Sequence, residues 1–130
     1  MSYDENNIFA KILRGEIPCN KIYEDDYVLS FYDINPQKKI HALVIPKGKY
    51  VDLDDFSENA SPDEMVALLN GIKTVAKKLG ISANVGKGYR ALTNISKDGG
   101  QEVPHLHFHL FGGEKVGKMV EWKKKLRETI

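Results

Sequence analysis

Apolar residues recur along this chain at two different spacings, and each spacing predicts a different kind of element. Between residues 62 and 79 they recur every three or four positions, which is the period of a helix with one buried face. Ser61 is a candidate N-cap, Pro62 takes the first helical position, and Glu64 completes a capping box. Gly80 is a natural C-terminal stop. We therefore expect one long helix that covers one face of a sheet.

A shorter helix and five strands are predicted in the rest of the chain. The helix, over residues 7–14, follows from apolar residues at helical spacing. Aromatic, β-branched and apolar runs predict strands at residues 21–24, 27–33, 40–45, 89–95 and 104–111. The first two strands suggest a hairpin, the third is apolar enough to be covered on both faces, and the last two flank a glycine-rich turn and should pair antiparallel.

Strands on both sides of one long helix predict an α+β fold. Neither a repeat nor a linker divides the sequence, so we expect a single domain over residues 1–130. Residues 1–6 are expected to be a flexible N-terminus and residues 114–130 a C-terminal tail. Within that tail, residues 123–125 are three lysines that should face water.

Composition and charge exclude several classes of protein. Because 19 Lys and Arg nearly balance 18 Asp and Glu, the chain has no strong field toward a nucleic-acid backbone, and no nucleic-acid partner is expected. No stretch approaches the ~20 apolar residues of a membrane span, and the polar, acidic N-terminus is neither a signal nor a transit peptide. Cys19 is the only cysteine and cannot form an internal disulfide, which fits a cytoplasmic protein.

Three of the four histidines alternate with apolar residues in one short segment. Side chains alternate between the two faces of a strand, so His105, His107 and His109 are predicted to share one exposed face. The intervening residues should belong to the core, and they are Leu106, Phe108 and Leu110.

Three interpretations fit such a face: solvated surface histidines, a metal site, or catalysis at phosphorus. A metal site is disfavoured because His105 and His109 would lie roughly 13 Å apart along a strand, and no nearby cysteine completes a ligand set. Imidazole is both a nucleophile and a proton carrier near neutral pH. The neutral groups nearby, Asn94 and Gln101, favour a singly charged phosphate ester or amidate over a polyphosphate, for which the chain has no P-loop.

The segment His105-Leu-His107-Phe-His109-Leu resembles the signature of the histidine-triad family, in which three histidines alternate with apolar residues. The resemblance extends over about residues 7–113, and Gly112-Gly113 is similar to the Hint branch, the purine nucleoside phosphoramidases. It implies a HIT-like antiparallel sheet of about five strands that continues across a homodimer.

The resemblance also implies a role for each histidine. His107 matches the nucleophile, which attacks the α-phosphorus and forms a nucleotidyl-histidine. His105 and His109 match the flanking histidines that bind the phosphate and manage protons, and His41 matches the residue that orients the triad. Water then releases AMP or GMP, and no metal or other cofactor is required.

The nucleotide contacts follow from the same resemblance. Asp33 matches the carboxylate that accepts the ribose hydroxyls, although its residue type alone favours a turn or capping role. Asn94 and Gln101 match phosphate-side contacts, and Gly100 and Val103 flank them in the substrate site. The matching purine pocket is apolar, and its residue types alone indicate core positions: Ile8, Phe9, Ile12, Ile17, Phe31 and Ile34.

Two departures from the family pattern affect these expectations. Where relatives with a structural zinc have cysteines, this chain has Asn7 and Ala10, so we predict no metal. Glu102 stands where Hint proteins commonly have a serine; its carboxylate either pairs with a cationic leaving group or faces solvent.

In Hint proteins the C-terminus lies near the partner's site, which makes Trp122 a candidate contact. The alternatives to a purine nucleoside phosphoramidase are a nucleotide-binding scaffold protein, a hydrolase of dinucleoside polyphosphates, or a metal-binding module.

Overall fold

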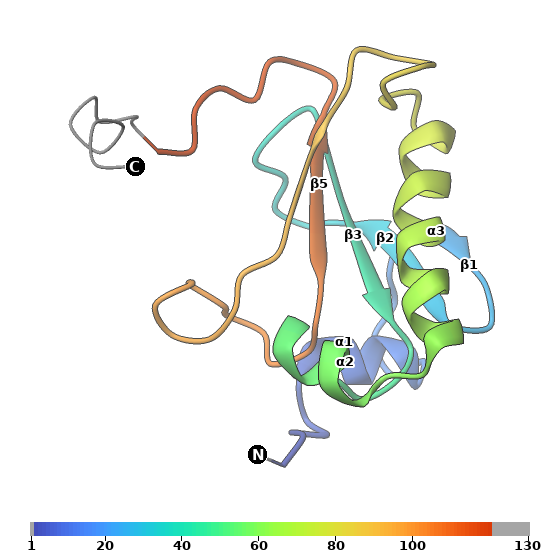
Figure 1. Ribbon diagram of the computed structural model, residues 1–130, viewed down its shortest axis with the longest axis vertical. Coiled ribbons are helices and arrows are strands. Elements are labelled where there is room, and N and C mark those ends of the chain that lie inside the picture. Colours follow the sequence, from blue (N-terminus) through green and yellow to red (C-terminus); the bar gives the residue numbers. More distant parts are fainter. Residues whose placement is uncertain (1, 121–130) are drawn as a thin grey trace.

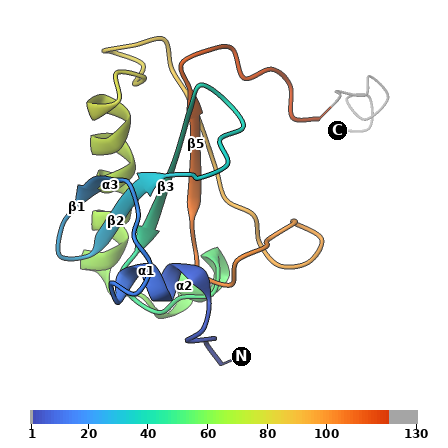
Figure 2. The ribbon, with the colours of Figure 1, turned by 180° about the vertical axis from the view of Figure 1, so that it is seen from behind.

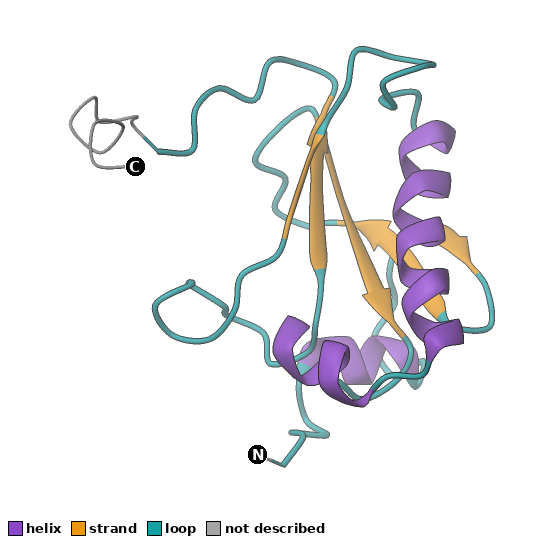
Figure 3. Ribbon diagram, viewed as in Figure 1, coloured by secondary structure: helices purple, strands orange, loops and turns teal. Residues whose placement is uncertain are grey.

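The computed structural model describes residues 2–120, which form one five-stranded sheet and three helices. The strand order is β1-β2-β3-β5-β4, and every neighbouring pair is antiparallel (Figures 1 and 3). The strands are β1 (Lys21–Glu24), β2 (Val28–Tyr32), β3 (Ile40–Pro46), β4 (Arg90–Leu92) and β5 (Phe108–Gly112). The predicted α+β fold with an antiparallel sheet of about five strands is therefore confirmed.

The long helix α3 (Pro62–Lys78) packs against one face of this sheet (Figure 1). Its capping box is present, because the Ser61 hydroxyl accepts from the Glu64 backbone while the Glu64 carboxylate accepts from the Ser61 backbone. Gly71 allows the helix to approach the sheet closely, since a Cβ at this position would lie 3.0 Å from Cγ2 of Val28. The buried core between α3 and the sheet fixes the position of the central strands.

The opposite face of the sheet is covered by the short helix α1 (Ile8–Leu13), whose N-cap is Asn7. Because side chains alternate along β2 and β3, both strands send a second set of apolar residues toward α1. β3 is thus covered on both faces, as its apolar run predicted. The second core cluster consists of Phe9, Leu29, Phe31, Leu43 and Ile45.

Helix α2 (Leu53–Asn59) is not expected from the sequence, and the buried face of α3 is narrower than expected. Helix α2 buries only Phe56 and so carries no apolar period that would predict it. It begins at Asp52, whose side chain accepts from the backbone N–H of Asp55. Leu69, expected on the apolar stripe of α3, is 69% exposed. The buried stripe of α3 is therefore narrower than its spacing suggests.

The strand that carries the histidine motif is shorter than predicted. β5 begins at Phe108 instead of residue 104, because the preceding segment makes its hydrogen bonds elsewhere. Pro104 has no N–H to donate, and the backbone N–H of Leu106 donates to the Tyr50 carbonyl rather than to a neighbouring strand. β4 is also shorter than the predicted run of residues 89–95.

The N-terminal segment lies at the same end of the sheet as the two short helices (Figure 2). Figure 2 shows α1 and α2 at the end of the sheet where β5 begins, close to the N-terminal segment. Within residues 2–120, no helix combines the length and the apolar character that crossing a membrane requires. Trp122 and the three lysines at 123–125 lie outside the described residues.

Candidate active site

The four histidines follow one another as neighbours in space, His41 beside His109, His109 beside His107, and His107 hydrogen-bonded to the backbone of His105. Ring centroids are 5.2 Å apart between His41 and His109 and 5.1 Å apart between His109 and His107. The predicted exposed histidine face is wrong: only His109 lies within β5, while His105 is fully buried and His107 is 6% exposed. Phe9 of α1 covers them, with its ring centroid 4.9 Å from that of His107. The histidines therefore form a largely buried row.

The protonation of His107 is fixed by a backbone carbonyl. Its Nδ1 lies 2.7 Å from the carbonyl oxygen of His105, which can only accept a hydrogen bond, so Nδ1 carries the proton. The Nε2 atom then keeps its lone pair, and no described residue forms a hydrogen bond with it. Burial lowers the pKa of His107, which keeps the ring neutral at pH 7. His107 thus has an unprotonated nitrogen available for nucleophilic attack.

His41 and His109 have the complementary arrangement. The backbone N–H of Gln37 donates to Nδ1 of His41 at 3.1 Å, so the proton of His41 is on Nε2. This Nε2 lies 2.9 Å from Nδ1 of His109, which must accept, and the proton of His109 is therefore on its own Nε2. Burial lowers the pKa of His109 to about 4. His107 consequently has a lone pair on Nε2, and the neighbouring ring of His109, with its centroid 5.1 Å away, has an N–H group on its own Nε2.

Both ring nitrogens of His105 have protein partners. Nε2 donates to the Pro46 carbonyl at 2.8 Å, and Nδ1 lies 2.6 Å from the hydroxyl of Tyr3. Burial lowers the pKa of His105 to about 4. The resemblance implies a phosphate-binding role for His105, but in this structure neither ring nitrogen is free to take it.

Asp33 directly follows β2, and its two carboxylate oxygens have different neighbours. One carboxylate oxygen accepts from the backbone N–H of Asn35 at 2.8 Å, which is the turn role that its residue type favours. The other lies 3.5 Å from Nε2 of His41. Asp33 is therefore placed beside the histidine row, with its carboxylate partly accessible.

The polar residues predicted on the phosphate side differ in their surroundings. The side-chain N–H groups of Gln101 donate to the carbonyls of Val51 and Val103, and its oxygen accepts from the backbone of Ser96. Gln101 therefore orders the glycine-rich loop that includes Gly100, and its amide is already engaged. Asn94 is half-buried at the end of β4.

Three residues at the site carried no sequence signal. Tyr3 binds His105, Gln37 sets the tautomer of His41, and the hydroxyl of Thr93 donates to the carbonyl of His107 at 2.7 Å. Two of these contacts reach the motif from 102 and 14 residues away along the chain. A local sequence pattern contains no information on such contacts.

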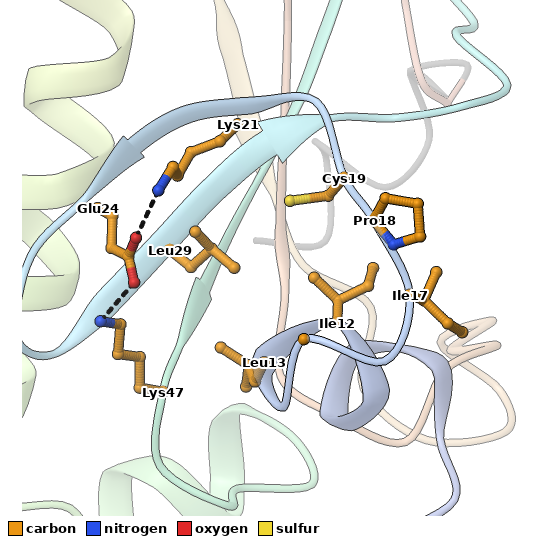
Figure 4. Close-up of a pocket in the computed structure, with 10 residues that line it drawn as sticks. Ile12, Leu13, Ile17, Pro18, Cys19, Lys21, Glu24, Leu29 and Lys47 are labelled. Atoms are coloured by element: carbon orange, nitrogen blue, oxygen red, sulfur yellow. Dashed lines mark hydrogen bonds and ion pairs between the residues drawn. The ribbon is translucent and has the colours of Figure 1, made fainter.

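The apolar residues predicted for the purine pocket do not all lie in the core. Phe9 and Phe31 are buried, but Ile34 is 92% exposed and Ile8 is 40% exposed, so the interpretation of these two residues as core positions is wrong. A cavity of about 460 Å³ lies between the loop after α1 and the β1–β2 edge, and Ile12 and Ile17 line it (Figure 4). Its rim is charged: Glu24 pairs with two lysines, Lys21 and Lys47, which lower its pKa to about 2.

One group of side chains has the spacing of metal ligands. Donor atoms of Asp33, His41 and His109 all lie within 4.8 Å of one another. This set differs from the three motif histidines considered from sequence. Because His41 and His109 share a hydrogen bond at 2.9 Å, a cation would have to replace the proton between them.

We expect the protein to lose stability between about pH 6.5 and pH 4. The pKa values of His105 and His109 are lowered to about 4 in the folded state, whereas unfolded histidine titrates near 6.5. The unfolded chain therefore binds protons first as the pH falls, so the stabilisation is complete above about pH 6.5. For His105 alone the loss at about pH 5 is ~2 kcal/mol.

The measurement is urea unfolding at about pH 7.5 and about pH 5. His105→Gln removes the titrating group, so its stability should depend less on pH than that of the wild type. Equal unfolding free energies of the wild type at the two pH values would contradict this assignment.

Comparison with known proteins places this geometry in a family. The model of the HIT domain matches residues 14–116 of the chain. An uncharacterised HIT-like protein of Azospirillum brasilense is 51% identical over 119 residues, covering 92% of this chain and 95% of that protein. A protein of Escherichia coli named purine nucleoside phosphoramidase is 40% identical over 120 residues, covering 92% and 97%.

Solved structures agree with the sequence relatives. A HIT family hydrolase from Clostridium thermocellum superimposes with a TM-score of 0.80 at 38% identity, covering 90% of this chain and 99% of that one. The buried histidine row, the sheet that carries it and the extent of these matches lead to one conclusion. This chain belongs to the HIT domain family.

Proposed function

We propose that this protein is a nucleotide hydrolase that cleaves the P–N bond of purine nucleoside phosphoramidates, with His107 as the nucleophile. The observation that carries this proposal is the pairing of a free Nε2 lone pair on His107 with an Nε2–H group on the adjacent His109. The name of the Escherichia coli relative supports the substrate class. The purine base and the amine leaving group rest on that relationship.

In the first half of the reaction, Nε2 of His107 attacks the α-phosphorus and the P–N bond breaks. The departing amine takes the Nε2 proton of His109. Before this step His109 takes up a second proton from solvent on Nδ1, which ends the hydrogen bond that His41 donates to that atom and makes the ring cationic. The negative charge of a bound phosphate favours this form by raising the pKa of His109. The phosphorylated ring of His107 is cationic too, and its Nδ1–H is stabilised by the His105 carbonyl.

In the second half, a water molecule attacks the same phosphorus and gives a proton to His109. The bond between phosphorus and Nε2 of His107 breaks, and its electron pair returns to the nitrogen. The products are a nucleoside monophosphate and the free amine. The enzyme regains its starting protonation state once Nδ1 of His109 returns its proton to solvent, and none of these steps uses a metal ion.

The remaining predicted contacts hold the nucleotide. We place the ribose hydroxyls on Asp33, whose carboxylate lies beside His41, and the base against the apolar residues of α1 and β2. Asn94 and the loop of Gly100, Gln101 and Val103 border the phosphate. The hydrogen bonds of Gln101 within this loop support a role in shaping it.

His107→Ala should lower the turnover of adenosine 5′-phosphoramidate at least about a thousandfold, because it removes the attacking nitrogen. The assay contains EDTA, so that a requirement for a metal ion would be detected. AMP binding and thermal unfolding of the variant serve as controls for its fold. Wild-type enzyme quenched in alkaline denaturant, which preserves a P–N bond to histidine, should contain a nucleotidylated peptide that includes His107.

Other results would favour other functions. Wild-type protein that binds AMP without turnover would favour a nucleotide-binding scaffold protein. Turnover that EDTA abolishes would favour a metal-dependent reaction, and turnover unchanged in His107→Ala would overturn the mechanism. Faster cleavage of a dinucleoside polyphosphate than of the phosphoramidate would indicate the other class of HIT substrate.

Glu102 is the proposed determinant of the leaving group. Its side chain is exposed, and although burial lowers the pKa of His107, the negative charge of Glu102 is near enough to oppose part of that lowering. A carboxylate near the attacked phosphorus repels anions and attracts ammonium groups. We therefore propose that the enzyme favours leaving groups that carry an ammonium group in addition to the nitrogen bonded to phosphorus.

Two AMP phosphoramidates of equal length test this role, one of pentylamine and one of 1,4-diaminobutane. Glu102→Gln and Glu102→Ser should lower kcat/KM for the diamine substrate by about two- to fivefold, which is the range of an exposed ion pair. The pentylamine substrate serves as the matched control and should be unaffected. An equal change for both substrates would show that Glu102 does not select the leaving group.

We also propose a homodimer in which the sheet continues from one protomer to the other. Two exposed apolar residues on α3, Val66 and Leu69, and the open edge at β4 support this assembly. Leu69→Glu should raise the dimer dissociation constant at least about tenfold, because it introduces a charge into the interface. Analytical ultracentrifugation measures the change, with Glu58→Lys on α2 as a charge control. A monomeric wild type would contradict the proposal.

A further inference from the structure

We propose that Tyr3 is a positioning residue of the active site, whose hydroxyl fixes the orientation of the His105 ring and, through the backbone of His105, the ring of His107. This inference deepens the proposed function and rests on it for the kinetic part of its test. The hydrogen bond joins residues that are 102 positions apart, with Tyr3 Oη 2.6 Å from Nδ1 of His105. The two rings meet edge to face, with centroids 5.6 Å apart.

The direction of this hydrogen bond follows from the other side of the ring. Nε2 of His105 lies 2.8 Å from the Pro46 carbonyl, which can only accept, so the proton of the neutral ring is on Nε2. Nδ1 must then accept, and Tyr3 is the donor. Burial raises the pKa of Tyr3, so its hydroxyl keeps the proton it donates. Without that hydroxyl, a fully buried nitrogen would lose its partner.

The effect reaches the nucleophile through the backbone of His105. The carbonyl oxygen of this residue accepts the Nδ1–H of His107 at 2.7 Å, which leaves Nε2 of His107 free to attack. Because the His105 ring is held from both sides, it cannot flip without losing both hydrogen bonds. Two hydrogen bonds, joined by the covalent structure of His105, therefore connect the hydroxyl of Tyr3 to the ring of His107.

The N-terminal segment is held in place independently of the histidines. The side chain of Asn7 donates to the Asp4 carbonyl at 2.8 Å, and Nη1 of Arg14 donates to the Glu5 carbonyl at 2.8 Å. Lys49 forms an ion pair with the Glu5 carboxylate at 2.8 Å. Residues 3–7 precede the region that the HIT domain model matches, residues 14–116. Tyr3 thus adds a component to the site from outside the matched region.

The hydroxyl also stabilises the neutral form of His105, because it donates to a lone pair that protonation would remove. Removing the hydroxyl therefore raises the pKa of His105 from its value of about 4. Activity that needs neutral His105 would then be lost at a higher pH than in the wild type.

Tyr3→Phe tests the role, since it removes the hydroxyl and keeps the ring that packs against His105. We expect kcat for adenosine 5′-phosphoramidate to fall by about five- to tenfold, while KM changes by less than about twofold because Tyr3 does not touch substrate. The acid limb of the profile of kcat against pH should move to higher pH. Tyr27→Phe removes an exposed hydroxyl from the turn between β1 and β2 and should leave all three quantities unchanged. An unchanged kcat and pH profile in Tyr3→Phe would overturn the proposal.

Nitrogen NMR of the histidine rings tests the same contact without substrate. In the wild type, His105 should be neutral and protonated on Nε2, with the Nδ1 signal of a hydrogen-bonded acceptor. In Tyr3→Phe this signal should move toward that of a free acceptor. A wild-type His105 protonated on Nδ1 would overturn the inference even if the variant does not fold. Absence of phosphoramidate turnover in the wild type contradicts only the proposed function, since the NMR result stands apart from it.

Discussion

Two backbone carbonyl groups determine how the histidines of this protein are protonated, and the chemistry of the site depends on them. Carbonyl oxygens accept hydrogen bonds but cannot donate, so the ring nitrogen that faces one must carry the proton. The His105 carbonyl places the proton of His107 on Nδ1, and the Pro46 carbonyl places that of His105 on Nε2. A backbone N–H at Gln37 has the opposite effect on His41. Main-chain groups thus determine which ring nitrogen carries the proton in His41, His105 and His107.

Burial of the histidine side chains keeps their rings neutral at pH 7. Desolvation is the largest cause of the lowered pKa at His105, His107 and His109. A neutral ring keeps one lone pair, which a nucleophile or a hydrogen-bond acceptor needs, and one N–H group, which can donate. The same burial makes the folded state resist protonation, so chemistry and acid sensitivity have a common origin.

The site depends on contacts between distant parts of the chain. β3 and β5 place His41 and His109 on adjacent strands, and α1 closes over His107 through Phe9. The N-terminal segment reaches the innermost ring through Tyr3. A glycine-rich loop shaped by Gln101 borders the outer side, where Glu102 is exposed. The fold thus combines a sheet, which sets the spacing of His41 and His109, with short segments that hold and cover His105 and His107.

The order of α1, α3 and the five strands, and the two-sided burial of β3, could be predicted from the sequence, because apolar period and capping residues act over a few neighbouring positions, whereas α2 could not. The sequence also indicated that Leu106 and Leu110 belong to the core, which they do. Only the tertiary structure decided that His105 and His107 are buried, that β5 begins after them, that Ile34 is exposed and that Tyr3 binds the motif. Each of these depends on which distant segment covers a residue or pairs with its backbone, such as the Tyr50 carbonyl that takes the N–H of Leu106. A local pattern sets which side of an element a residue is on, whereas its burial and protonation are set by groups that only folding brings near.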